Sequence, residues 1–412
     1  MEKGFHSKDY FNEAYANLDE FAERVSNLIG CPITIEDSNH QLLAYSTHSH
    51  ITDEARILTI MGRRVPEKVI NSLWKEGIIP ALLNSSEPIV IQPKQQVGLG
   101  KRIAISIRKN ENALGFIWAA LEPESDLPPQ GLSILKLAAK EAKNQLLLLQ
   151  SRMKRKEESY QEYFWKLLTG HYGTEKEFRL HMARYPFILP QPYCIIAFEF
   201  EHVITADTEK HIQYLINTTQ KIKIIFHTID TDKLILLGDY ITANSSQAIS
   251  SFIESFIANM NERFDIKVMT GGFGRPYHQL IDAQKSYTEA MLVMNLKKQY
   301  TYELASIFNY EQLGIYQYLE TLSQQRASQN ELPAGLLTLK EYDHKHQTDL
   351  YHTLETFLTC NSDPSEASSL LHIHSNTLSY RLKRITELSG YNLKDTNIRA
   401  YLYIEFKLAR FD

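Results

Sequence analysis

Cysteine is scarce in this chain, and so are long apolar runs. The three cysteines, Cys31, Cys194 and Cys360, lie far apart and form no CxxC pair, which indicates a reducing cytoplasm rather than a disulfide scaffold. No run approaches the roughly 20 apolar residues that span a bilayer, and the first residues lack the apolar core of a signal peptide. We therefore expect a soluble, cytoplasmic protein with no membrane partner.

An excess of positive charge is also missing. The sequence has 44 Lys and Arg against 49 Asp and Glu, a formal net charge of −5, which argues against non-specific coating of nucleic acid. Any contact with DNA must come from a local basic patch. A hydrophobic content of 43% is typical of a soluble globular protein, and the length of 412 residues predicts roughly two to four domains.

The stretch 363–388 has the pattern of two short helices joined by a tight turn. Asp363 can cap the first helix, Pro364 suits its first position, and Glu366 stands where a capping-box acid reaches back. Apolar residues at helical spacing then form one stripe on each helix. We expect the first stripe to contain Ala367, Leu370 and Leu371, and the second Leu378, Leu382, Ile385 and Leu388.

The second helix begins near Ser375 and leaves amides, hydroxyls and cations on its outer face. A short helix, a turn and a helix with such a face is the layout of a DNA-reading helix-turn-helix. Asn376 and Thr377 stand near the helix start and should reach base edges, whereas Lys383 should hold phosphate. The residues expected to contact double-stranded operator DNA are Ser375, Asn376, Thr377, Ser379, Tyr380, Arg381, Lys383 and Arg384. For Arg381, which flanks the buried stripe, a structural ion pair is an equal alternative.

The segment Leu371–Ile385 reads L-x-I-H-x-N-T-L-x-Y-R-L-x-R-I. It resembles the C-terminal helix-turn-helix of the PucR/CdaR family of bacterial transcription regulators, and the resemblance extends from about Leu336 to Phe411. Ser375 is a departure, because the family often has Arg there. The resemblance implies control, usually activation, of a catabolic operon by a small-molecule effector. Purine intermediates, sugar diacids and amino acids such as proline are all compatible effectors.

Residues 1–128 predict a helix from Asp9 to Ile29, a hairpin, a helical insertion that includes residues 66–77, and three further strands. This order of elements resembles GAF-type sensor domains, which hold ligands between the sheet and the insertion. Candidate effector contacts are Tyr45, Arg56, Arg63, Arg64 and Trp74. The pair His48 and His50 lacks the further ligands that a metal site needs, so no metal or other cofactor is expected.

Residues 129–170 predict one long helix. Its apolar positions recur in steps of four and three, the spacing of a coiled-coil seam. We therefore expect a homodimer or higher oligomer, because a lone helix would leave the seam exposed. The ten seam positions are Leu135, Ala139, Ala142, Leu146, Leu149, Met153, Lys156, Tyr160, Tyr163 and Leu167.

Residues 171–300 predict a ferredoxin-like order of strand, helix, two strands, helix and strand. This resembles the degenerate GGDEF-like, cyclase-related domain of the same regulators. A cyclase needs paired glycines in its central hairpin, but this chain has Asp230, Thr231 and Asp232 there, so neither catalysis nor catalytic residues are expected. Gly271, Gly272 and Gly274 resemble a phosphate cradle only weakly.

The whole chain is thus expected to be a multidomain α+β protein: a GAF-like sensor, a coiled-coil linker, a ferredoxin-like central domain, a helical connector over 301–335 and an all-α DNA-binding domain over 336–412. Two other classes of protein stay open at this point. One is a nucleotide-signalling enzyme. The other is an adaptor whose C-terminal helices bind a partner protein.

Overall fold

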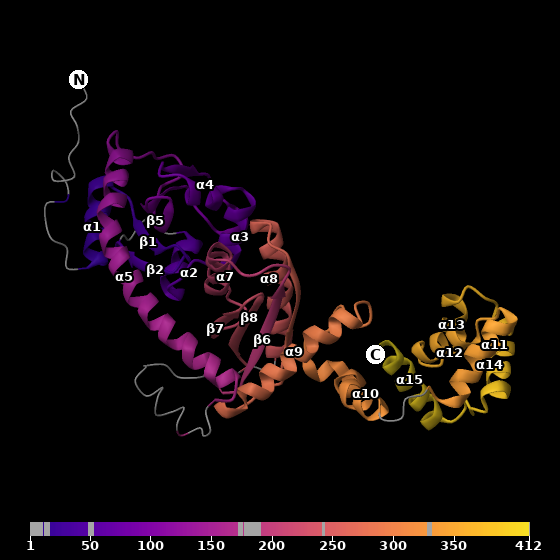
Figure 1. Ribbon diagram of the computed structural model, residues 1–412. Coiled ribbons are helices and arrows are strands. Elements are labelled where there is room, and N and C mark those ends of the chain that lie inside the picture. Colours follow the sequence, from indigo (N-terminus) through magenta and orange to yellow (C-terminus); the bar gives the residue numbers. More distant parts are fainter. Residues whose placement is uncertain are drawn as a thin grey trace. The chain divides into compact units, whose positions relative to one another are not determined.

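The computed structural model describes residue 11 and residues 17–47, 53–171, 176, 191–240, 244–327 and 332–411, without the side chains of 150–160, 162, 163, 280, 327 and 411. The chain divides into two compact units, Met1–Met291 and Leu292–Asp412, which are described one at a time. The first unit contains two β-sheets, and the second is helical (Figure 1). Among the described helices, none has the length and apolar character that crossing a membrane requires.

The first sheet has five strands in the order β2-β1-β5-β4-β3, each antiparallel to its neighbours. We call this sheet and the helices packed on it the N-terminal lobe. The predicted order of helix, hairpin, helical insertion, three strands and exit helix is observed. The elements are α1 (Leu18–Ile29), β1 (Ile33–Asp37), β2 (Leu42–Tyr45), α2 (Glu54–Gly62), α3 (Glu67–Lys75), α4 (Ile78–Asn84), β3 (Ile89–Ile91), η2 (Gln95–Val97), β4 (Arg102–Lys109), β5 (Asn112–Ala120) and α5 (Gly131–Leu168).

Strand alternation sends side chains of the first sheet into two separate cores. Ile33 of β1 and Ile117 of β5 pack with α1 and α5 on one face. Phe116 and Trp118 of β5 pack with α2, α3 and α4 on the other. This is the division that a pleated strand imposes, because successive residues point to opposite faces. The first helix starts later than predicted: Phe11 is not helical, and Asn17 caps α1 by accepting from the Glu20 amide at 2.9 Å.

Helix α5 runs from the N-terminal lobe to the second sheet (Figure 1). Four of its seam positions, Leu135, Ala139, Ala142 and Leu146, are buried in the core of the N-terminal lobe, and Leu167 is buried against the second sheet. The expectation that the whole seam needs a partner helix is therefore wrong for these five positions. The same spacing lets one helix cover a sheet. Leu149 is 37% exposed, and the other four seam side chains lie outside the described residues.

The second sheet has four strands in the order β7-β8-β6-β9, all antiparallel. This order is the ferredoxin-like arrangement that the sequence predicted. We call the sheet and its helices the central lobe. Helix α8 packs on one face, and the ends of α5 and α9 cover the other. The elements are β6 (Tyr193–Phe200), α7 (Ala206–Thr218), β7 (Ile224–Asp230), β8 (Lys233–Asp239), α8 (Ser245–Phe264), β9 (Val268–Phe273), η3 (Leu280–Asp282) and α9 (Ala283–Gln299).

Two glycines of the central lobe, Gly271 in β9 and Gly274 just after it, have a packing role. A Cβ on Gly274 would lie 2.1 Å from the carbonyl oxygen of Ser286, and one on Gly271 would lie 2.8 Å from Ile253. Both distances are shorter than van der Waals contact allows, so only glycine permits this approach of strand and helix. The weak likeness to a phosphate cradle has this structural explanation.

The described residues of the second unit form two apolar clusters. One joins the end of α9 to η4, α10 and α15, and the other holds α11–α15 together. The elements are η4 (Tyr310–Tyr318), α10 (Leu319–Ala327), α11 (Ala334–His346), α12 (Leu350–Thr359), α13 (Pro364–Leu370), α14 (Ser375–Ser389) and α15 (Thr396–Phe411).

A buried cation fixes α15 to the connector. Lys407 is only 3% exposed, and its Nζ lies 3.0 Å from Oε1 of Glu303. The rings of Tyr300, Tyr316 and Tyr403 surround the same ammonium at 6.0, 5.4 and 5.2 Å from their centroids. Ion pairing and cation–π attraction compensate the lost hydration of the lysine. This cluster therefore joins the last turns of α15 to the connector.

We predict that this anchor weakens in acid. Burial raises the pKa of Glu303, but the hydrogen bond from Lys407 and the charges of Lys407 and Arg410 outweigh burial and lower the pKa overall. The stabilisation is thus present above the unfolded pKa of about 4.3 and is lost as the pH falls through the folded value. Glu303→Gln should speed hydrogen exchange in α15 at neutral pH, and the difference from the natural protein should shrink in acid. Exposed Glu320→Gln serves as control; equal α15 protection at neutral pH would contradict the prediction.

Candidate nucleic-acid interface

The first helix of the predicted helix-turn-helix starts as its sequence requires. The carboxylate of Asp363 accepts hydrogen bonds from the amides of Ser365 at 2.8 Å and Glu366 at 2.9 Å. Pro364 occupies the first helical position, where a missing amide hydrogen costs nothing. Helix α13 is thus capped locally, and its start follows from these side chains alone.

The turn between α13 and α14 is equally tight. His372 adopts a left-handed backbone with φ of 53°. His374 then caps α14, because its Nδ1 accepts from the amide of Asn376 at 3.2 Å. The histidine pair in the turn therefore has a conformational role.

The two helices bury one shared stripe. Leu378 and Ile385 of α14 are fully buried and pack in one cluster with Ala367 of α13. The prediction that Leu370 belongs to the buried stripe is wrong, because its side chain is 63% exposed. Leu371 packs against the cluster instead. In this short helix the inward direction lies between Ala367, Ser368 and Leu371, and Leu370 is turned away from it.

The opposite face of α14 carries the predicted DNA contacts. Its 15 residues span about 22 Å. Tyr380 is 71% exposed, and the polar side chains of the first two turns share this exposure. The exposed predicted residues are Ser375, Asn376, Thr377, Ser379, Tyr380 and Lys383. The structure thus brings six of the eight candidates onto one solvent-facing surface.

The two remaining candidates, Arg381 and Arg384, are engaged within the fold. Nη1 of Arg381 donates to the buried hydroxyl of Thr353 in α12 at 2.9 Å. Arg381 thus has a structural contact, but its partner is a hydroxyl and not the carboxylate of an ion pair. Arg384 lies over the ring of Tyr342 at 5.1 Å and pairs with Glu387 at 3.1 Å. These contacts orient both guanidinium groups, and Lys383 is left as the exposed cation of this part of α14.

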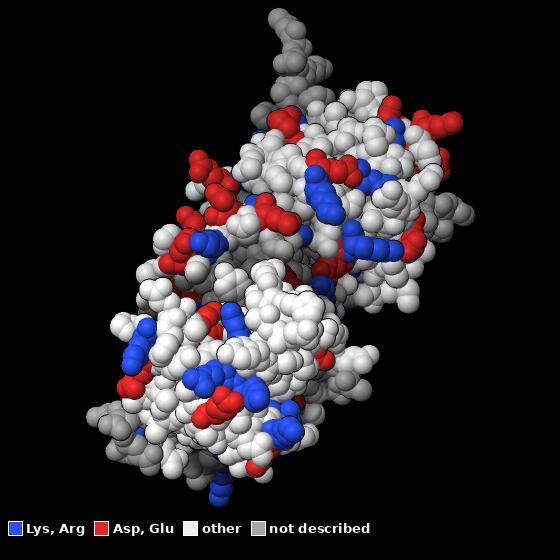
Figure 2. Space-filling model, turned by 90° about the vertical axis from the view of Figure 1, so that its right-hand side faces the viewer, with Lys and Arg blue, Asp and Glu red and all other residues white. Residues whose placement is uncertain are grey.

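Charge on the visible surface is mixed. Figure 2 shows basic and acidic side chains interspersed over one face of the molecule, with no single large basic area. This agrees with the net charge of −5. A broad positive field of the kind that attracts DNA is therefore not visible on this face.

The five candidate effector contacts do not form one site. Arg56 is 2% exposed, and its Nη2 donates to the carbonyl oxygen of Ser46 at 2.8 Å inside the N-terminal lobe. Tyr45 lies under the guanidinium of Arg63, 5.9 Å from it. Nε1 of Trp74 donates to the hydroxyl of Tyr214 in α7 at 2.6 Å, so Trp74 joins the N-terminal and central lobes.

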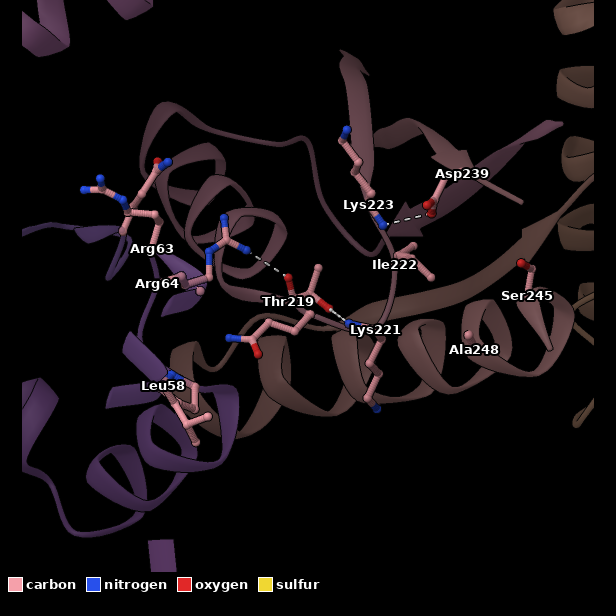
Figure 3. A pocket seen from close by; sticks show the side chains of 14 residues that line it. Leu58, Arg63, Arg64, Thr219, Lys221, Ile222, Lys223, Asp239, Ser245 and Ala248 are labelled. Carbon is pink, nitrogen blue, oxygen red and sulfur yellow. Dashed lines mark hydrogen bonds between the residues drawn. The ribbon is translucent and has the colours of Figure 1, made fainter. Parts of the chain in front are cut away.

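Arg63 and Arg64 line a cavity between these lobes (Figure 3). The lysines on its far wall, Lys221 and Lys223, were not predicted. In the sequence these lysines look like part of an ordinary charged loop. Nothing there marks them as cavity residues, because the cavity forms only when the two lobes pack together.

A buried polar cluster in the N-terminal lobe also went unpredicted. Nη2 of Arg102 lies 2.7 Å from Oδ1 of Asp53, and Glu36 lies 3.3 Å from Nδ1 of His40. Burial raises the pKa of Glu36, against the effect of the His40 hydrogen bond. Burial also acts to raise the pKa of Asp53, but the charge and hydrogen bonds of Arg102 lower it. The available signal for Arg102 was its place as the first residue of the apolar strand RIAISIRK.

The described residues contain no group of three or more His, Cys, Asp and Glu that could hold a metal ion. His48 and His50 lie outside the part of the chain that the structure describes. His346 stacks on Tyr342 with ring centroids 4.0 Å apart. His346 thus has a packing contact and His374 a capping contact.

A capped helix, a tight turn and a second helix with an exposed polar first half define a helix-turn-helix DNA-binding protein. Residues 350–408 match the PucR C-terminal helix-turn-helix domain, and residues 169–296 match the GGDEF-like domain. The chain belongs to the PucR/CdaR family of bacterial transcription regulators and is itself a DNA-binding regulator. The resemblance predicted from Leu371–Ile385 is confirmed.

Similarity to characterised regulators covers nearly the whole chain. The DNA-binding transcriptional activator AdeR of Bacillus subtilis is 41% identical, over 98% of this chain and 96% of its own. The proline-responsive transcriptional activator PutR of Bacillus subtilis is 26% identical, over 96% of this chain and 97% of its own. The carbohydrate diacid regulator of Escherichia coli is 36% identical over 30% of this chain and 31% of its own.

Proposed function

We propose that this regulator reads its operator with the first two turns of α14 placed in the major groove. The observation that carries the proposal is the orientation of α14, whose Leu378 and Ile385 are buried while Asn376, Thr377 and Lys383 are exposed. Recognition helices present their N-terminal residues to base edges. Asn376 supplies an amide that can pair with adenine through two hydrogen bonds, and Lys383, two turns further on, reaches phosphate.

The regulator is proposed to be a cytoplasmic activator of a catabolic operon that responds to a small-molecule effector. Relatives over nearly the whole chain are named as activators, and one of them as proline-responsive. A purine intermediate, a sugar diacid or an amino acid would each suit this role. The N-terminal lobe is the proposed sensor, and its five-stranded sheet with a helical insertion supports a GAF-like assignment.

The proposed domains keep the boundaries predicted from the sequence: 1–128 sensor, 129–170 linker helix, 171–300 GGDEF-like domain, 301–335 connector and 336–412 DNA-binding domain. The matched ranges 169–296 and 350–408 support the GGDEF-like domain and the DNA-binding domain. Helix α5 is proposed as more than a linker, since its two ends belong to the cores of both lobes.

Substitutions on α14 separate base reading from phosphate binding. Asn376→Ala should lower discrimination between operator and random DNA by about 1–3 kcal/mol, with non-specific binding retained. Lys383→Ala should weaken binding to all DNA alike and reduce the salt slope of log affinity by about one. Gel shifts over a salt series, on operator and scrambled duplexes, measure both effects.

Lys394→Ala is the matched control, because Lys394 is exposed beyond the far end of α14. It should leave specificity intact. If Asn376→Ala and Lys383→Ala both bind like the natural protein, α14 does not read DNA, and the adaptor alternative is favoured.

The regulator is proposed to act as a dimer through the middle of α5, between the two internally packed ends. Leu149 is 37% exposed and Leu148 is 62% exposed there, which a partner helix would cover. Light scattering at micromolar concentration should therefore show a dimer, and Leu149→Lys should shift it toward monomer. Ser133→Lys, at an exposed position near the start of the same helix, should not. A monomeric natural protein, with or without DNA, would refute this.

The central lobe is proposed to have no cyclase activity, in line with relatives that are transcription regulators. The β7–β8 turn has no glycine pair: Thr231 there has φ of 57°, and Oδ1 of Asp232 lies 2.8 Å from Nζ of Lys233. A side chain at the turn opposes the close backbone approach that a triphosphate requires. Incubation with GTP or ATP and magnesium should yield no cyclic product. Turnover that disappears in Asp232→Ala would establish the enzyme alternative.

A further inference from the structure

Within the first unit, a cavity of about 700 Å³ lies where the N-terminal and central lobes meet. We call it the seam cavity. One wall comes from the turn after α2, which carries Arg63 and Arg64, and the other from the loop between α7 and β7, which carries Lys221 and Lys223 (Figure 3). Pockets that hold small molecules in proteins have volumes of roughly 300–1,000 Å³. The seam cavity is therefore large enough for a metabolite.

The charge of the seam cavity is one-sided. Among its described lining residues, four are cationic and one, Asp239, is acidic. Oδ1 of Asp239 accepts from the backbone amide of Lys223 at 2.9 Å, so part of its charge is already directed at the main chain. Cations from two different lobes thus outnumber the acid that lines the same cavity, and like charges at short range repel.

The contacts at the base of the seam cavity hold the walls in place. Nη1 of Arg64 donates to the carbonyl oxygen of Thr219 at 3.2 Å, and Nε2 of Gln220 donates to that of Val65 at 2.8 Å. Each contact joins the N-terminal lobe to the central lobe. A third contact between the lobes involves an acid, because Oε2 of Glu67 accepts from the backbone amide of Gln220 at 3.2 Å.

Two of the cations also have contacts of their own. The guanidinium of Arg63 lies 5.9 Å from the centroid of the Tyr45 ring. Nζ of Lys221 donates to the carbonyl oxygen of Ser251 at 3.0 Å and to the hydroxyl of Ser255 at 3.1 Å. Preorganised donors of this kind cost little conformational entropy when a ligand binds.

We propose that the seam cavity binds a small multivalent anion, one that carries two or more phosphate or carboxylate charges, and that this anion holds the two lobes together. Guanidinium and ammonium groups both recognise these anions, and the arginine fork matches either one. The anion contacts cations of both lobes only when the lobes are docked. The anion therefore binds the docked state more tightly than the undocked state, and this difference in affinity stabilises docking.

Calorimetric titration of the full chain with pyrophosphate and with citrate, at constant ionic strength in chloride, tests the site. We expect saturable binding of at least one probe with one site per chain. Binding of pyrophosphate alone would indicate a phosphate-bearing ligand, and binding of citrate alone a polycarboxylate. Arg63→Asn and Lys223→Gln should each weaken binding about threefold or more, and the double variant about tenfold or more. Asparagine is chosen because it tolerates the left-handed backbone at position 63.

The control is Lys267→Gln, an exposed lysine of the central lobe that pairs with Glu201 outside the seam cavity. It should bind both probes as the natural protein does. Hydrogen exchange should also slow in residues 62–67 and 219–223 when the probe binds.

Three results would overturn the proposal: no binding of either probe at millimolar concentration, equal weakening by Lys267→Gln, or binding without added protection in both segments.

Discussion

The direction in which α14 turns its apolar stripe is the constraint on which the DNA-binding unit depends. Leu378 and Ile385 are buried against Ala367 and the helices behind it. Helix geometry then leaves Asn376 and Thr377 no alternative to the solvent side. Burying the stripe stabilises the fold, and the same burial orients the reading face. A rotation of α14 about its axis would expose Leu378 and Ile385, so the stability and the orientation of the reading face would be lost together.

The two sheets are joined by a second device, the long helix α5. Its first half completes the core of the N-terminal lobe and its last turns complete that of the central lobe. Trp74 and Arg64 add hydrogen bonds directly between the lobes. A ligand that changes the packing of either lobe therefore acts on elements shared with the other. This is a physical basis for coupling within the first unit, because packed cores respond to strain as units.

Local signals were predictable from the sequence and long-range ones were not. The Asp363 cap, the strands and the exposed face of α14 each follow from residues within one or two turns of the chain. Leu370 was misplaced, because so short a helix leaves its inward direction to its neighbours. The seam of α5 was attributed to a partner, since the spacing that suits a coiled coil also suits a sheet. The seam cavity has no signature in sequence, because Arg63 and Lys223 meet only through the packing of two lobes.

The central claim, that the start of α14 enters the major groove, is tested most directly by cleavage of DNA from a tethered reagent. The natural cysteines Cys31, Cys194 and Cys360 are all buried, so the thiol of an Asn376→Cys variant can be labelled selectively with an iron chelate that cuts nearby DNA. The cuts should be confined to the operator, with the strand offset of a major-groove source, and a Lys394→Cys label should cut weakly or not at all. Cuts of equal strength from both labels, or none from position 376 in a protein that still binds the operator, would contradict the claim.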